Sequence, residues 1–175
     1  MAAVMGLADD QVKTVCEETA GVVVAANFNA PGQVVIAGEA EAVATASEAL
    51  KTAGAKRAVM LDVSGPFHSP LMSAATEEFA QALDQVDLQM PVVPVVQNVS
   101  AAVPETLDQL RDNLLAQISA PVLWSSCVET MVGQGVEQFV ECGPGNVLAG
   151  LIKRTSKATP TQGLATPAGL AQALS

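Results

Sequence analysis

The chain of 175 residues has no tyrosine, and only 3% of its residues are aromatic. Surfaces that stack on nucleic-acid bases need aromatic rings, so this scarcity disfavours such a surface. Basic residues are also few, because 8 Lys and Arg stand against 18 Asp and Glu, which gives a net charge of −10. This balance argues against nucleic acid and anionic membranes as general partners. An acidic partner would need a local basic patch.

Cysteine is scarce as well, with Cys16, Cys127 and Cys142 far apart and no Cys-x-x-Cys pair. This spacing predicts neither a disulfide framework nor a zinc site, and it favours a reducing compartment. No apolar run reaches the ~18 residues of a membrane span, and the N-terminus lacks the basic region of a signal peptide. We therefore expect a cytoplasmic location, with an organelle stroma or matrix as the alternative.

Residues 1–64 alternate between short apolar runs and amphipathic stretches in the order β-α-β-β-α-β, which is typical of a ferredoxin-like subdomain. The order predicts a four-stranded antiparallel sheet with two helices on one face and the first strand between the third and fourth. Asp9 is the expected N-cap of the first helix. The expected strands are 2–7, 22–29, 33–37 and 56–63, and the expected helices are 9–20 and 39–53.

After residue 64 the pattern changes to longer amphipathic helices with short strands between them. Alternating strands and helices favour a parallel-sheet α/β layer. We expect helices at 71–86, 107–118, 124–132 and 147–154, and strands at 92–96 and 138–142. The sequence thus predicts an α+β subdomain over 1–64, part of an α/β core over 65–154, and a linker with a short terminal helix over 155–175.

His68 is the only histidine, and it lies between a Gly-Pro turn and the start of a helix. One imidazole cannot form a histidine-rich metal site, but it can act as a lone general base, because histidine is the usual side chain for moving a proton near neutral pH. A structural histidine at a loop end is the other interpretation. This segment by itself favours the structural one.

Two predicted loops contain glycines at positions that are typical of tight turns. Residues 27–38 predict a hairpin around Pro31-Gly32, with asparagines that can cap the turn. Residues 141–148 join a strand to a helix, and the amides at such a helix N-terminus can bind an anion. The dinucleotide fingerprint needs a small residue where Leu148 stands, and Pro144 removes an amide, so the pattern predicts a tight structural turn instead.

Four stretches in this order resemble the C-terminal half of the malonyl-CoA:acyl carrier protein transacylase family. They are NFNAPGQVVIAG at 27–38, GPFHSPLM at 65–72, APVLW at 120–124 and ECGPGNVL at 141–148. The resemblance covers nearly all of residues 1–154. It implies an α/β-hydrolase-like acyltransferase core into which the ferredoxin-like subdomain is inserted.

The resemblance also implies an activity in fatty-acid or polyketide synthesis, with a role for three residues. The family moves malonyl from coenzyme A to the phosphopantetheine thiol of acyl carrier protein through an acyl-serine, and coenzyme A is a substrate, with no resident cofactor. His68 matches the family's base, and Gln117 matches the glutamine whose main-chain carbonyl orients it. Phe67 matches a position where phenylalanine accompanies a preference for malonyl over methylmalonyl.

The chain departs from the family where the nucleophile should be. The family's serine lies in a Gly-His-Ser-Leu-Gly turn, and no Gly-x-Ser-x-Gly occurs in these 175 residues. The arginine that holds the malonyl carboxylate and a glutamine of the oxyanion hole also belong to the half that is not matched. We therefore expect a fragment, a truncated gene or one piece of a split protein, inactive alone and prone to self-association.

Two other functions remain open at this stage. Residues 1–64 alone could be a non-catalytic ligand-binding module of the ferredoxin-like kind. The chain could also be a docking fragment for an acidic carrier protein, using local basic patches. The residues that could form these patches are Lys51, Lys56, Arg57, Lys153, Arg154 and Lys157.

Overall fold

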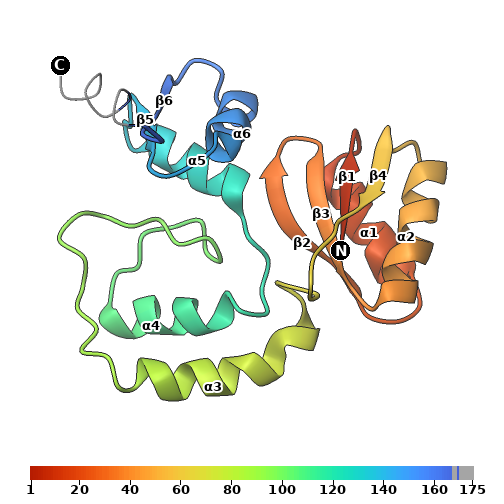
Figure 1. Cartoon of the computed structure of the whole chain (residues 1–175), viewed down its shortest axis with the longest axis horizontal. Helices are drawn as coiled ribbons and strands as arrows, with labels where there is room; N and C mark the ends of the chain where they lie inside the picture. The colour runs from red at the N-terminus through yellow and green to blue at the C-terminus, as the bar shows by residue number, and fades with distance from the viewer. Residues whose placement is uncertain (167–168, 170–175) are drawn as a thin grey trace.

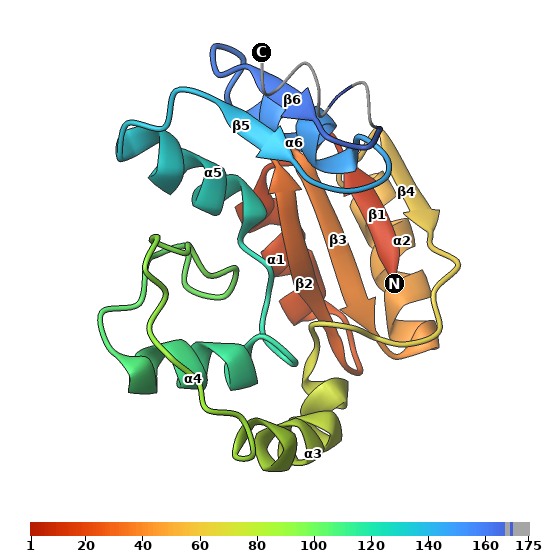
Figure 2. The ribbon, with the colours of Figure 1, turned by 60° about the vertical axis from the view of Figure 1, so that its left-hand side comes forward.

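A computed structural model describes residues 1–166 and residue 169. Its first part is an antiparallel sheet with strand order β2-β3-β1-β4 (Figure 1). Helices α1 (Asp9–Glu18) and α2 (Ala40–Thr52) lie together behind this sheet in Figure 2. The strands are β1 (Ala2–Met5), β2 (Val23–Ala30), β3 (Gln33–Gly38) and β4 (Arg57–Met60). Because β1 pairs antiparallel with both β3 and β4, the predicted ferredoxin-like arrangement is confirmed.

The core of this part lies between the sheet and its two helices. Along β1, Ala2 and Val4 are buried while Ala3 and Met5 are half-buried, as the two-residue period of a strand requires. Ile36 of β3 and Leu50 of α2 are fully buried in the same cluster. Helical and strand periods thus converge on one apolar layer, and burial of this kind is the main source of folding free energy.

The start of α1 differs from the expectation. Asp9 is the first helical residue, and Ala8 occupies the N-cap. The Ala8 N–H donates to the Gln11 side-chain oxygen at 3.2 Å, so a residue in the first turn satisfies this amide without a capping side chain. Asp9 and Asp10 instead place negative charge in the first turn, where the helix dipole favours it.

The second part consists of helices and a small parallel sheet, which α6 (Val147–Thr155) contacts. The expected helices are confirmed, with the first one opening as a short 3₁₀ turn. β5 (Phe139–Glu141) pairs in parallel with β6 (Thr161–Gly163). The helical elements are η1 (Pro70–Met72), α3 (Ser73–Leu83), α4 (Leu107–Ala116), α5 (Trp124–Gly133) and α6 (Val147–Thr155).

Two predictions in this part are wrong. Residues 92–96 do not form a strand, because no neighbouring strand in the described part of the chain offers hydrogen bonds, and Val92 is fully exposed. Residues 155–167 are not only a linker, since Thr161–Gly163 joins β5. The short terminal helix was predicted beyond residue 166, where only residue 169 is described. The division at residues 64 and 154 stays a prediction.

The two parts meet at the free edge of β2. The Phe28 N–H donates to the Val122 carbonyl, and the Val122 N–H donates to the Ala26 carbonyl, both at 2.8 Å. Residues just after α4 therefore extend the sheet in parallel before α5 begins. This return holds the C-terminal end of α4 close to the segment that leaves β4.

Candidate active site

His68 lies in a short loop between β4 and η1, and its backbone has an unusual conformation. Its φ is +58°, in the left-handed region that favours glycine. Pro66 and Pro70 stand two residues to either side and fix their own φ angles. The ring is half-buried. A strained backbone at a titratable residue is typical of a functional position.

The ring of His68 contacts the end of α4. Its Nδ1 lies 2.8 Å from the main-chain oxygen of Gln117, 49 residues along the chain. The predicted contact is confirmed. A carbonyl can only accept, so Nδ1 carries the hydrogen, and in the neutral ring Nε2 is free to take a proton.

Gln117 is the C-cap of α4, and its position gives the contact an electrostatic meaning. The last carbonyls of a helix have no partner within the helix and carry partial negative charge. Within residues 1–166, His68 forms no ion pair with a carboxylate. A helix end therefore orients the ring in place of an aspartate.

A buried glutamine that the sequence did not single out tethers α4. Gln97 is 8% exposed, and its amide Nε2 donates to the Leu110 carbonyl at 3.1 Å. Its amide oxygen accepts from Asn113 Nδ2 at 2.8 Å. The Gln97 carbonyl also accepts from the Cys127 thiol of α5 at 3.7 Å. Gln97 thus joins α4 to α5, and nothing in the local pattern distinguishes it from an exposed glutamine.

Phe67, the predicted selectivity residue, stands beside His68 and is 40% exposed. Its ring lies against Gly65, where an added Cβ would sit 3.5 Å from it. Gln117 lines a cavity of about 330 Å³ with Leu110 and Leu114 of α4. Another cavity, of about 410 Å³, lies between α1, β2 and residues 121–126, and its lining includes none of the three predicted site residues.

The glycine loop before α6 is a structural turn, as its sequence predicts. Gly143 and Gly145 have φ of +128° and +94°, which other residues rarely adopt. The Glu141 carboxylate accepts from the Leu148 and Ala149 amides at 3.0 and 2.9 Å. The chain's own carboxylate therefore occupies the place of an anion at this helix N-terminus.

Among residues 1–166 and 169, no helix combines the length and apolar character needed to cross a membrane. The same residues contain no group of three or more His, Cys, Asp or Glu side chains placed to hold a metal ion.

The chain belongs to the acyl transferase domain family, which it matches over residues 1–172. Within that family it is similar to malonyl-CoA:acyl carrier protein transacylases. It is 47% identical to the Escherichia coli K12 enzyme over 99% of this chain and 57% of the relative, and 41% identical to the Bacillus subtilis enzyme over 95% and 54%.

Solved structures give the same result. The transacylase of Xanthomonas oryzae superposes with a TM-score of 0.94 at 46% identity, covering 99% of this chain and 56% of that one. A malonyl transacylase solved with a type II polyketide synthase acyl carrier protein gives 0.95 at 41% identity, covering 99% and 57%. The resemblance and the fold class predicted from the sequence are confirmed. The chain spans about half the length of the relatives it matches.

Proposed function

We propose that this chain supplies the base of a malonyl-CoA:acyl carrier protein transacylase. The observation that carries the proposal is the 2.8 Å contact between His68 Nδ1 and the Gln117 carbonyl. That contact leaves Nε2 as the proton acceptor at a fixed place, which general base catalysis requires. The serine nucleophile comes from polypeptide outside these 175 residues, as the absence of Gly-x-Ser-x-Gly indicates.

The proposed reaction has two matching halves. Nε2 of His68 takes the serine proton as the serine oxygen attacks the malonyl thioester carbon. The carbon–sulfur bond then breaks, and the imidazolium gives its proton to the coenzyme A sulfur, which leaves malonyl on serine. In the second half Nε2 takes the proton of the carrier's phosphopantetheine thiol. That sulfur attacks the ester carbon, the bond between this carbon and the serine oxygen breaks, and the imidazolium returns the proton to that oxygen.

Phe67 is the proposed selectivity residue for the acyl group. Its exposed ring beside His68 limits the space at the α-carbon of the acyl chain, where malonyl has hydrogen and methylmalonyl has a methyl group. Discrimination of one methyl is worth only about 1–3 kcal/mol. Phe67 therefore sets a preference for malonyl and does not exclude the larger substrate.

The test uses the purified chain with radiolabelled malonyl-CoA, alone and with a separately expressed N-terminal half of a close relative. We expect no stable acyl-protein from the chain alone and transfer to acyl carrier protein with both halves. His68→Ala should abolish that transfer, because no other group takes the proton. Labelling of this chain by itself at any serine would contradict the proposal.

A carrier-docking role without catalysis is the second candidate, and one observation favours it. Lys153 and Lys157 are exposed and line one cavity of about 440 Å³ beside α6. Neither forms an ion pair with the described residues. If docking is the whole function, the His68→Ala variant will still bind the carrier protein. Acyl transfer will then be absent both with the chain alone and with the two halves together. Transfer that depends on His68 would exclude this candidate.

A further inference from the structure

Ser69, the residue after His68, is completely buried. Its hydroxyl donates to the Pro66 carbonyl at 2.6 Å, and its own carbonyl accepts from the Met72 N–H at 3.0 Å. The first bond closes residues 66–69 into a ring, and the second joins that ring to η1. Burial and the bond to Pro66 together exclude Ser69 as a nucleophile, because its hydroxyl is shielded from solvent and already donates to a main-chain carbonyl.

The two flanking prolines explain why this hydroxyl matters. Pro70 restricts Ser69 to extended backbone, and the observed φ of −124° and ψ of 163° agree with that restriction. Pro66 has a fixed φ. The remaining conformational freedom of the loop lies in the backbone torsions of Phe67 and His68. The hydrogen bond from Ser69 to Pro66 restricts these torsions, because it joins the residues on either side of them.

We propose that Ser69 is a positioning residue, whose hydroxyl holds the His68 backbone in the left-handed conformation that brings Nδ1 to the Gln117 carbonyl. The left-handed region is unfavourable for a residue with a Cβ, so something must hold His68 there. Without the bond to Pro66 the backbone relaxes toward negative φ. The ring then swings away from the end of α4. As a statement about catalysis this inference rests on the proposed function.

The chain offers a direct readout, because His68 is its only histidine. The nitrogen-15 spectrum of the imidazole at alkaline pH reports which nitrogen carries the hydrogen in the neutral ring. In the wild-type chain we expect the Nδ1–H tautomer to exceed about nine-tenths of the population, because a fixed acceptor faces Nδ1. In Ser69→Ala we expect that share to fall until Nδ1–H is the minor form, since the ring then meets water on both sides and the Nε2–H tautomer predominates in a solvated neutral histidine side chain.

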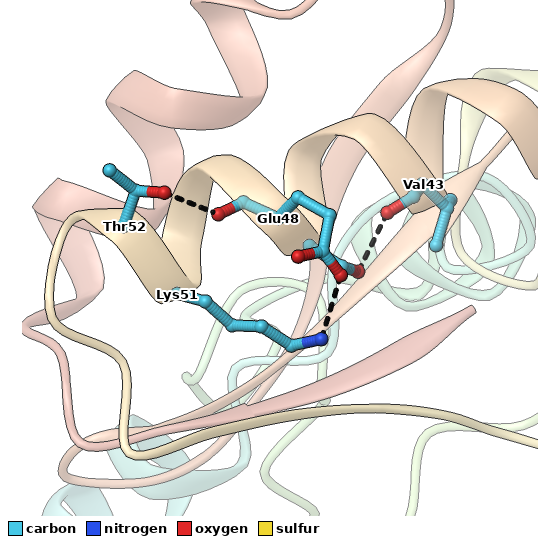
Figure 3. A network of polar contacts seen from close by, with 5 residues as sticks. Val43, Glu48, Lys51 and Thr52 are labelled. Carbon is cyan, nitrogen blue, oxygen red and sulfur yellow. Dashed lines mark hydrogen bonds and ion pairs between the residues drawn. The ribbon is translucent and has the colours of Figure 1, made fainter.

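Ser47 provides a matched control. It is 5% exposed, and its hydroxyl donates to the Val43 carbonyl at 2.7 Å within α2. Figure 3 shows this carbonyl among the polar contacts of α2. Ser47→Ala removes the same kind of buried bond in another element. It should lower stability without changing the His68 tautomer, so loss of the tautomer in both variants would contradict a specific role of Ser69.

A second variant covers the case in which Ser69→Ala does not fold. Ser69→Cys fills the same space with a weaker donor, and its Nδ1–H share should fall between those of serine and alanine. A wild-type tautomer share in whichever variant folds would overturn the proposal.

The catalytic consequence is measured separately with both halves of the enzyme. There Ser69→Ala should lower kcat about tenfold and leave KM unchanged, because a misplaced base affects the transition state and not binding. If the halves show no transfer at all, the proposed function fails while the tautomer result still stands. If transfer occurs and the tautomer does not respond to Ser69, the positioning role alone fails.

Discussion

Removal of the Gln97 side-chain bonds tests how firmly the end of α4 is held. Gln97→Leu keeps the approximate size of the side chain but removes the bonds to Leu110 and Asn113. Each hydrogen bond contributes about 1 kcal/mol net, and the Leu110 carbonyl and the Asn113 amide are left without a partner. The free energy of unfolding should therefore fall by about 2–3 kcal/mol. For a chain of this size that corresponds to a drop in melting temperature of about 4–12 °C.

Urea unfolding followed by the fluorescence of Trp124, the single tryptophan, measures this loss. Gln81→Leu is the matched control, since Gln81 is exposed on α3, and we expect it to change stability by less than about 0.5 kcal/mol. The His68 tautomer should respond to Gln97→Leu as well, because α4 carries the accepting carbonyl. Equal stability of the two variants would refute the tethering role assigned to Gln97.

The remaining predictions concern side chains whose burial or position is known. Cys142 is exposed while Cys16 and Cys127 are buried, so a thiol reagent such as DTNB should react with one cysteine quickly and with the other two only on unfolding; three fast thiols would contradict the packing. Burial raises the pKa of Cys16 and Cys127 from 9.0 to about 11. Below pH 9 the two thiols keep their protons in both the folded and the unfolded chain, whereas between pH 9 and 11 they ionise only in the unfolded chain. The free energy of unfolding should therefore fall by roughly 2 kcal/mol per thiol over that range. Equal urea midpoints at pH 8 and 10.5 would refute this prediction. Gln117→Ala should leave the His68 tautomer unchanged in the same nitrogen-15 spectrum, because the main-chain oxygen remains. In the two-half enzyme Phe67→Ser should raise the kcat/KM ratio of methylmalonyl to malonyl about tenfold, and an unchanged ratio would remove Phe67 from selectivity.

Short-range patterns predicted the first part of the chain well. The two-residue period around Val4 and the helical spacing of Val43, Ala46 and Leu50 fix which faces are apolar. Once those faces are known, one antiparallel sheet with two helices behind it buries them all. The Pro31-Gly32 turn then joins β2 directly to β3, which is the hairpin observed.

The second part shows the limit of such patterns. The valines of residues 92–96 have the composition of a strand, but a strand exists only where a neighbour supplies hydrogen bonds, and composition does not contain that information. The reverse holds at Thr161–Gly163, whose polar residues form β6 because β5 lies beside them. The N-cap at Ala8 likewise depends on the Gln11 side chain and not on the cap residue itself.

The sequence by itself determined the apolar faces of residues 1–60 and the helices that follow. Four ordered motifs also indicated the family of the chain, and with it the matching positions His68, Gln117 and Phe67. The tertiary structure alone decided how His68 is held. The contact between His68 and Gln117 joins residues 49 apart in the chain. The hydrogen bond from the Ser69 hydroxyl to the Pro66 carbonyl depends on a backbone conformation that no local pattern specifies. Local sequence fixes which surfaces must be buried, whereas the placement of one ring against one carbonyl depends on how all the buried surfaces fit together.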